Sequence, residues 1–391
     1  MIEYATLLSG DGQLIIIAQE HVYLLELIKS VLFNQKPVLV EDVNWEKIFE
    51  TAKLHCIVPL LVSCVPKYQR SDWNAVLYQS KARYMQMIYE QNLLVQLFKN
   101  NDIPYVILKG TAAAIYYPNP TLRTYGDIDI YVSKNSIKSA NDLIERSGYR
   151  FISNTVREYE FEKNGIVFEL HSKFSSKHYN NIEHVFINGL NNSVEYHISN
   201  CSFKGLPTYE NGLVLLGHIM QHLKATGIGL RQIIDWMMFV HQELDDSAWN
   251  NHFRELALEA GLEKLAITVT YMCKKWLGLP NDITWCNTAD EDVADQLLLR
   301  VLNDGNFGCD RAPFENIRLS IKNDGLFKHL QRTGLENWSS AQKHKVLRPF
   351  AWLFQMLRYA GLGIAGLFTG KKIFRKDKQN LKLEELWKSL E

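Results

Sequence analysis

The sequence lacks the patterns that mark several common classes of protein. Its six cysteines are scattered over 391 residues with no CxxC pair, which excludes a zinc site of the usual spacing and argues against a disulfide framework. Lys+Arg and Asp+Glu both number 43. A protein that coats nucleic acid usually carries a basic excess, so an extended nucleic-acid partner is disfavoured. The N-terminus has neither a basic lead nor a cleavable apolar run, and we expect a cytoplasmic protein.

Long apolar runs are also scarce. The most apolar stretch, residues 349–370, is interrupted by Gln355 and Arg358, and the uninterrupted part is too short to span a bilayer comfortably. A basic cluster follows it directly. Two interpretations remain open: a helix packed on the protein, which we favour, and peripheral contact of residues 349–376 with an anionic membrane surface. The basic cluster consists of Lys371, Lys372, Arg375 and Lys376.

What the sequence does contain is a change of hydrophobic period along the chain. Residues 1–100 place apolar side chains at helical spacing and are expected to form an N-terminal helical region. Residues 101–204 alternate short β-rich runs with helical segments, which predicts a small mixed sheet with helices. Residues 205–391 return to the helical period. The predicted fold class is therefore α+β or mixed α/β, with a sheet-containing core between two helical regions.

Helix-capping residues, turn residues and changes of hydrophobic period mark where the expected helices and strands begin and end. Asp42 or Asn44 could cap a helix that begins near residue 45. A helix should follow directly after the first core strand, and another should begin at residue 137 and end at Gly148. The expected strands span residues 105–110, 127–132, 149–153, 157–162 and 165–171.

Two aspartates in the segment GDIDIYV are the strongest sign of chemistry. Asp127 and Asp129 would project from the same face of a strand, with Cα atoms roughly 6.6 Å apart. Carboxylates at that spacing can bridge two divalent ions, and hard oxygen ligands with no cysteine nearby favour Mg²⁺ or Mn²⁺. The alternative is a solvated edge strand, because a lone D-x-D pattern is a weak signal.

A third carboxylate would complete such a site. Glu169 lies on a later expected strand that could neighbour the acidic one, and His171 would share its face. Whether Glu169 is a ligand or an ordinary surface residue of the strand is open from spacing alone. The acids of the preceding strand compete for the role, although they recur like a solvated face. They are Glu158, Glu160 and Glu162.

The segment LKGTAAA upstream predicts a phosphate site. Gly110 and Thr111 stand at a strand-to-helix junction, where backbone N–H groups point outward and the threonine hydroxyl can add a hydrogen bond. Lys109 and Arg123 could supply positive charge for a triphosphate. Either basic residue could instead belong to the ordinary surface, and Arg123 is the stronger candidate because it lies in the loop that leads into the acidic strand.

Two histidines share one face of a later helix. His218 and His222 are four residues apart, but the intervening residues include no glutamate, so a metallohydrolase site is a poor interpretation. Arg231 follows on the next expected helix. A buried polar network that fixes this helix pair to the sheet is the interpretation we favour from periodicity.

The block from residue 105 to residue 132, YVILKGTAAAIYYPNPTLRTYGDIDIYV, resembles the signature of the uncharacterised nucleotidyltransferase family in the DNA polymerase β-like superfamily. That superfamily pattern is a strand, Gly-Ser (here Gly110-Thr111), a helix, a strand with D-x-D, and a later third acid. The resemblance extends to the helix pair after residue 205 and covers roughly residues 40–240. Threonine for serine and Glu169 for the more usual aspartate are mild departures.

The resemblance implies a nucleotidyltransferase core that binds an NTP such as ATP and two Mg²⁺ or Mn²⁺ ions. A nucleoside monophosphate would pass to an unidentified acceptor, which could be a small molecule, a glycan precursor or a protein. The alternative is a catalytically degenerate module that binds a nucleotide or a partner. The implied metal ligands and catalytic residues are Asp127, Asp129 and Glu169. The implied nucleotide-binding residues are Lys109, Gly110, Thr111, Arg123, His171, His218, His222 and Arg231.

Overall fold

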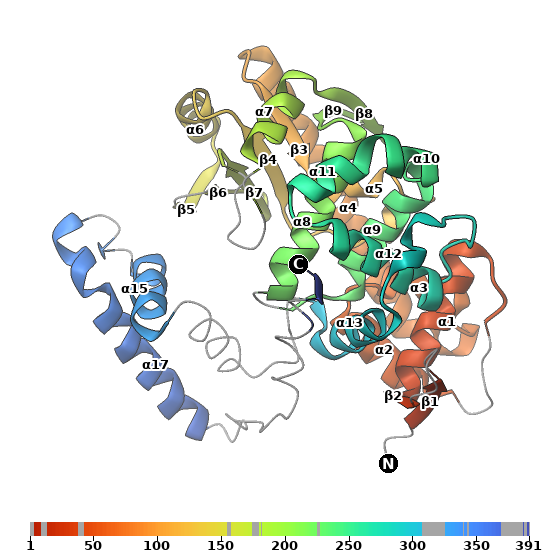
Figure 1. The fold of residues 1–391 in the computed structure, drawn as a ribbon. Helices are drawn as coiled ribbons and strands as arrows, with labels where there is room; N and C mark the ends of the chain where they lie inside the picture. The colour runs from red at the N-terminus through yellow and green to blue at the C-terminus, as the bar shows by residue number, and fades with distance from the viewer. Residues whose placement is uncertain are drawn as a thin grey trace. The chain divides into compact units, whose positions relative to one another are not determined.

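The fold is mixed α/β, as predicted, and the chain forms two compact units (Figure 1). One unit comprises Met1–Phe307 together with Glu385–Glu391, and the other comprises Gly308–Glu384. The computed structural model describes residues 4–8, 14–37, 43–154, 158–173, 180, 182–224, 227–306, 325–338, 340–341, 344–368, 386 and 389–390.

The larger unit is built on a seven-stranded mixed sheet with the strand order β5-β6-β7-β4-β3-β9-β8. The pairs β4–β7 and β3–β9 are parallel and the other neighbours are antiparallel. All five expected strands are present; β8 and β9 were not foreseen. The strands are β3 (Tyr105–Leu108), β4 (Ile128–Val132), β5 (Arg150–Asn154), β6 (Glu158–Lys163), β7 (Ile166–His171), β8 (Val194–Ile198) and β9 (Cys201–Gly205).

Helices before and after the sheet make up most of the rest of this unit. Asn44 caps α2, as expected, by accepting a hydrogen bond from the Lys47 backbone N–H. The helices are α1 (Gln19–Phe33), α2 (Trp45–Leu54), α3 (Val58–Leu61), α4 (Arg70–Asn100), α5 (Gly110–Ala114), α6 (Ile137–Arg146), α7 (Glu183–Asn191), α8 (Thr208–Lys224), α9 (Leu230–Glu243), α10 (Asp246–Ala248), α11 (Arg254–Glu259), α12 (Glu263–Trp276) and α13 (Glu291–Asp304).

The prediction that residues 1–100 are helical is wrong at the start of the chain. Strands β1 (Tyr4–Leu8) and β2 (Leu14–Ala18) pair there as an antiparallel hairpin. The sequence LIIIA of β2 is rich in β-branched isoleucine, which suits a strand better than a helix. α1 begins at Gln19, directly after β2 ends at Ala18, so no turn residue separates the strand from the helical period that follows.

The two faces of the sheet pack against different helices, and this decides where the aspartates point. Ile128, Ile130 and Val132 belong to a core shared with α4 and α6, which confirms the expected burial of that face. Tyr131 points the other way and its ring contacts Phe186 of α7. Because side chains alternate along a strand, Asp129 shares the face of Tyr131.

The smaller unit contains a helical hairpin. Helices α15 (Leu326–Asn337) and α17 (Ala351–Phe368) are joined through the 3-10 turn Lys345–Phe350. Gly334 is required at their crossing, because a Cβ atom there would lie 1.9 Å from the Ala351 carbonyl oxygen. Within the described residues, no helix is long and apolar enough to cross a membrane.

Candidate functional site

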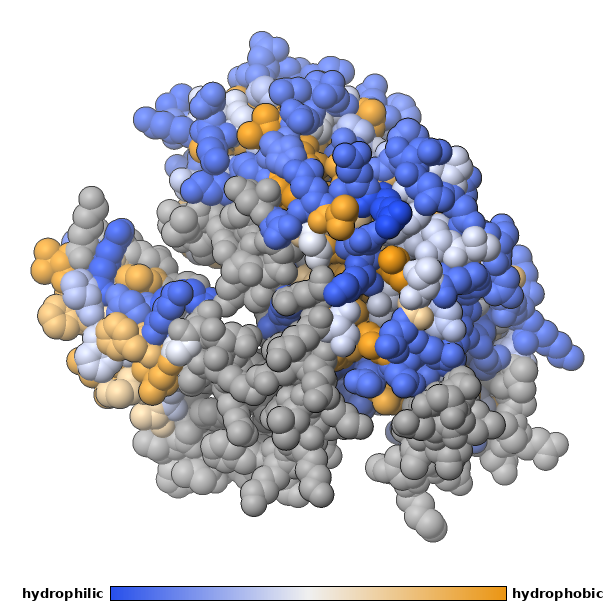
Figure 2. Space-filling view, viewed as in Figure 1, coloured by the Kyte–Doolittle hydropathy of each residue, from blue (hydrophilic) through white to orange (hydrophobic). Residues whose placement is uncertain are grey.

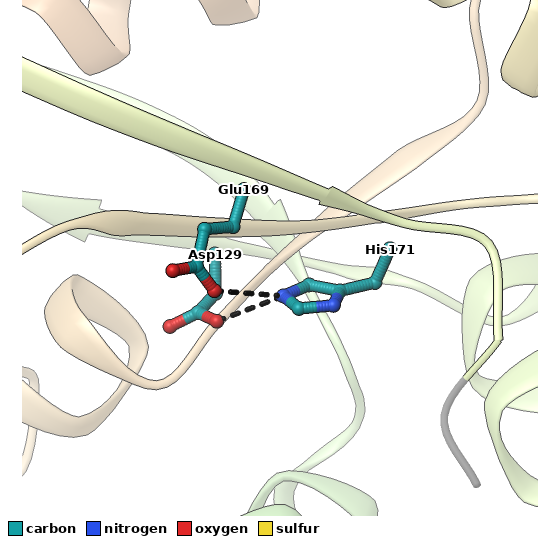
Figure 3. Close-up of side chains that lie close together, drawn as sticks. All are labelled: Asp129, Glu169 and His171. Carbon is teal, nitrogen blue, oxygen red and sulfur yellow. Dashed lines mark hydrogen bonds and ion pairs between the residues drawn. The ribbon is translucent and has the colours of Figure 1, made fainter. Parts of the chain in front are cut away.

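The site begins with the register of two neighbouring parallel strands. β4 and β7 place Asp129 directly opposite Glu169, and His171 lies two residues further along β7. Figure 3 shows the three side chains converging, and one ligand atom from each lies within 4.8 Å of the others. This confirms that the strand bearing Glu169 neighbours the acidic strand and that His171 shares its face.

Asp129 is held by two donors on one oxygen. Its Oδ1 atom lies 2.8 Å from Lys109 Nζ and 2.9 Å from His171 Nε2. The same His171 nitrogen is 3.5 Å from Glu169 Oε2, and His171 Nδ1 is 3.4 Å from Glu158 Oε2. Glu158 was foreseen only as part of a solvated face, whereas the β6–β7 register brings it opposite His171.

The electrostatics separate the two acids of this group. Burial alone would raise the pKa of Asp129, but the charge of Lys109 and the hydrogen bond from His171 outweigh it and hold that pKa well below its usual range. Burial, followed by the charges of Asp129 and Asp127, raises the pKa of Glu169 to about 9. Asp129 is therefore ionised at neutral pH, and Glu169 holds a proton unless a further cation arrives.

Asp127 stands beside this group and outside it. β4 begins at Ile128, so Asp127 is the residue before the strand, and it is half-buried. Its charge still reaches the site, since it contributes to the raised pKa of Glu169. The expectation that Asp127 is a metal ligand stays a prediction.

Arg83 is a neighbour of Asp127 that the sequence did not reveal. Its guanidinium donates to the backbone carbonyls of Gly126 and Gly165, both at 2.7 Å. It thereby ties α4 to the loops that lead into β4 and β7. No sequence signal could single out Arg83, because it lies among other polar residues on a long helix.

The junction between β3 and α5 has an unusual backbone. Lys109 has a φ of 46° and Gly110 a φ of 30°. A non-glycine residue is strained in this region, and such strain is typical of functional sites. This backbone conformation turns the chain from β3 into α5, and the Lys109 side chain contacts Asp129 from this turn. Thr111 is buried, and its hydroxyl donates to Gln91 Oε1 at 2.7 Å, so its predicted contact with phosphate stays a prediction.

Arg123 lies in a separate buried ion pair. Its Nε and Nη2 atoms are each 2.7 Å from a different oxygen of Asp235 on α9, and the Tyr117 hydroxyl donates to the same carboxylate. Arg123 is only 6% exposed. The Arg123 guanidinium is thus paired with Asp235, which the sequence did not connect to Arg123. The expected role of Arg123 in nucleotide binding stays a prediction.

His218 and His222 are close to each other and to the acidic group. Their ring centroids lie 4.2 Å apart. Burial, together with the nearby charges of Lys109 and Arg231, lowers the pKa of His222 to about 3. The pKa of His218 falls for the same chief reason, with contributions from His222 and Lys109. Both imidazoles are therefore neutral at pH 7. Arg231 Nη1 is 3.4 Å from the Thr124 carbonyl oxygen, in the loop before β4.

The donor set of Asp129, Glu169 and His171 fits a divalent cation. Two carboxylates and an imidazole offer the hard oxygen and nitrogen ligands that such ions use. The excess negative charge that raises the Glu169 pKa is what a bound cation would relieve. The Lys109 ammonium already contacts Asp129, so an ion would share that carboxylate with Lys109 or displace it.

Comparison with known proteins identifies one matching family. The model described as "Uncharacterised nucleotidyltransferase" matches residues 41–278. No curated protein matches the sequence.

Several solved structures resemble part of the chain. ANT(2")-Ia in complex with adenylyl-2"-tobramycin is 10% identical with a TM-score of 0.32, over 40% of this chain and 88% of that chain. The lincomycin-bound lincosamide antibiotic adenylyltransferase LnuA is 11% identical with a TM-score of 0.29, over 39% and 94%. An antigenic nucleotidyltransferase-like protein from Paracoccidioides brasiliensis is 14% identical with a TM-score of 0.30, over 49% and 92%.

Proposed function

The chain belongs to the uncharacterised nucleotidyltransferase family, and from that premise we propose that it transfers a nucleoside monophosphate from an NTP to an acceptor with the aid of Mg²⁺ or Mn²⁺. The observation that carries this proposal is the pairing of Asp129 with Glu169 on adjacent parallel strands, with His171 closing the group. Three potential ligands from two neighbouring strands on one face of the sheet support a binding site more strongly than a solvated edge strand would.

Asp129, Glu169 and His171 are the residues that would hold the cation, and Asp127, immediately before β4, is the candidate for a further carboxylate. When bound, a divalent cation there would offset the charge of the triphosphate and lower the pKa of an acceptor hydroxyl. Two such ions are the implication of the superfamily pattern. The compact group in this structure accounts for the ligands of one, and Asp127 is the candidate to complete the second.

The β3–α5 junction is the candidate site for phosphate binding. The Gly110 and Thr111 backbone N–H groups are the candidate donors to the outer phosphates, and no Cβ atom at Gly110 obstructs their approach. Lys109 supplies an ammonium at the junction itself, and Arg231 adds positive charge from α9. His218 and His222, neutral at pH 7, could accept or donate hydrogen bonds without adding charge. Arg123 would contribute indirectly, because its ion pair with Asp235 holds α9 in position.

The chemical step is an in-line displacement. The acceptor hydroxyl oxygen forms a bond to the α-phosphorus while the bond to the bridging oxygen of the pyrophosphate breaks, and pyrophosphate leaves. A carboxylate of the site, within hydrogen-bond reach, takes the hydroxyl proton. The acceptor is a small molecule, a glycan precursor or a protein; the zero net charge of the chain disfavours an extended nucleic acid.

Incubation of the full chain with each α-labelled NTP, with Mg²⁺ or Mn²⁺ and with candidate acceptors tests this proposal. We expect label transfer by the wild type, loss of transfer in Asp129→Ala, and no loss in Glu195→Gln, which removes an exposed acid on β8. Transfer that persists in Asp129→Ala would show that the chemistry takes place elsewhere.

A non-catalytic module is the second candidate, favoured by one observation. Lys109 already supplies a cation to Asp129 at 2.8 Å, and a proton on Glu169 removes most of the remaining charge. Such a site could bind a nucleotide without turnover. Equilibrium binding of NTP by the wild type, with no label transfer to any acceptor and no effect of metal, would favour this candidate.

A further inference from the structure

Charge is divided unevenly between the two units of the chain. Residues 308–384 contain fifteen Lys and Arg against six Asp and Glu, a formal charge of +9, while the whole chain has a net charge of zero. The remainder therefore carries −9. The smaller unit is strongly basic for its length, and a unit with this charge is attracted to anionic surfaces.

The helical hairpin of the smaller unit also exposes a run of apolar side chains. Phe350 is 54% exposed, Leu353 37%, Met356 43% and Leu357 63%. Leu353 follows Phe350 by three residues, and Met356 and Leu357 follow Leu353 by three and four, so the side chains form one stripe along α17 and the turn before it. Leu326 and Phe327 at the start of α15 are also exposed. Figure 2 shows apolar side chains gathered on the described part of this unit.

The opposite side of α17 makes the contacts that hold the hairpin together. Phe354 stacks on Trp338 with ring centroids 5.1 Å apart, and Tyr359 stacks on His329 and shares a hydrogen bond with it. Gln355 is buried on the same side. The exposed stripe is therefore not required to join α15 to α17.

We propose that the α15–α17 hairpin docks on an anionic lipid surface, with the stripe of Phe350, Leu353, Met356 and Leu357 in the interface and the basic residues at the headgroups. Charge alone would suit any polyanion, and an apolar stripe alone would suit a second copy of the chain. An exposed apolar stripe on a helix, within a unit that carries this basic excess, is what an anionic membrane surface binds. α17 does not meet the requirements for a spanning helix, so it would lie on the surface. The proposal is independent of nucleotidyl transfer.

Flotation of the full-length protein with vesicles tests the proposal. We expect binding to phosphatidylcholine vesicles that contain phosphatidylglycerol and little binding to phosphatidylcholine alone. Leu357→Asp should weaken binding at least about tenfold, because a buried leucine side chain is replaced by a charge that the lipids repel. Lys371→Gln with Lys372→Gln should also weaken binding, by about fivefold for each charge removed.

Leu258→Asp is the matched control, since Leu258 lies on α11 of the larger unit and is 60% exposed, against 63% for Leu357. It should leave binding unchanged, and circular dichroism should show all variants folded. Equal binding of the wild type and Leu357→Asp would overturn the proposal and point to a purely electrostatic polyanion site. Self-association that Leu357→Asp abolishes, without vesicle binding, would overturn it in favour of a second copy of the chain. Absence of binding to anionic vesicles at low salt would also overturn it.

Discussion

Two buried ionic clusters lie close together in the larger unit and differ in how completely they are balanced. Arg123 and Asp235 face each other through two hydrogen bonds of 2.7 Å, one on each carboxylate oxygen. Lys109 and Asp129 also pair, at 2.8 Å, but Lys109 and His171 both approach the same oxygen. Burial and the negative charges of Asp129 and Asp127 raise the pKa of the neighbouring Glu169.

From this difference we expect a structural role for the Arg123–Asp235 pair and a binding role for the Asp129 cluster. Arg123–Asp235 is a fork-to-carboxylate pair with matched charges and matched donors, so it has no capacity for a further ion. The Asp129 cluster has more acids than bases, and a cation would lower its energy. Buried charge alone therefore does not identify function; the excess of one sign does.

Asp235→Asn should give the largest effect on stability. It leaves the Arg123 guanidinium buried without its anion, which typically costs about 3–5 kcal/mol. Urea unfolding should detect this, whereas Asp142→Asn on the exposed side of α6 should change the free energy of unfolding by less than about 0.5 kcal/mol.

Asp235→Asn can also contradict the distinction between the Arg123–Asp235 pair and the Asp129 cluster. If Asp235→Asn lowered the free energy of unfolding by less than about 1 kcal/mol while it abolished nucleotidyl transfer, Arg123 would belong to the substrate site, as the sequence suggested. Replacing both partners with apolar residues sharpens the point. Arg123→Met with Asp235→Leu should recover much of the stability lost in Asp235→Asn, because no unpaired charge remains buried.

Glu169→Gln should show the opposite behaviour. We expect transfer to fall by about a hundredfold to a thousandfold, since a ligand of the cation is lost. Stability should hold or rise, because the folded protein keeps Glu169 protonated at neutral pH and glutamine resembles that form. Initial rates and thermal melts measure the two effects. Glu160→Gln changes the acid opposite Glu169 on β6 and should alter the rate less than threefold; a larger loss would assign the third carboxylate to β6.

Sequence reasoning reached the acidic cluster because that cluster depends on local order. The D-x-D strand and the Glu-x-His strand are each recognisable from alternation. Their adjacency was expected only from their order along the chain, and the sheet pairs them directly although α6, β5 and β6 lie between them in sequence. The partner of Arg123 could not be foreseen in the same way. Asp235 is more than a hundred residues away, and only the packing of α9 against the loop before β4 brings the two together.

The same distinction explains the errors in the fold. The strands β3 to β7 have clear alternation or turn signals, so their positions were correct. β1 and β2 were absorbed into the helical period of α1, and β8 has exposed residues with little apolar contrast. The Gln91 partner of the Thr111 hydroxyl was likewise not foreseen, because it lies on α4 and no local pattern connects it to Thr111.

Metal affinity should depend on pH through Glu169. Because its pKa is raised to about 9, a cation that binds its carboxylate must release the proton below that pH. Affinity for Mn²⁺ should therefore rise by up to about tenfold per pH unit from pH 7 to pH 9 and level off above. Titration calorimetry in buffers of different ionisation enthalpy measures both the affinity and the proton release. A Glu169→Gln variant should lose this dependence, and a wild type without it would show that Glu169 is not a ligand.

His55 resembles the Arg123–Asp235 pair in being buried with its hydrogen-bond partner in place. We expect its protonation to have the smallest effect on stability among these predictions. His55 is 1% exposed, and its Nδ1 atom accepts a hydrogen bond from the Leu230 N–H at the start of α9. Burial, with a contribution from His21, lowers the pKa of His55 to about 3. The folded state therefore disfavours the proton, so its stability is complete above the unfolded pKa and is lost as pH falls below about 6.5. Between pH 6.5 and pH 5.5 the loss should be about 1 kcal/mol.

His55→Asn keeps an acceptor that does not titrate, so the urea midpoint of this variant should change less than that of the wild type over this pH interval. If the two proteins lost stability equally, the acid sensitivity would lie with other groups, and the neutral pair His218 and His222 would be the next to replace.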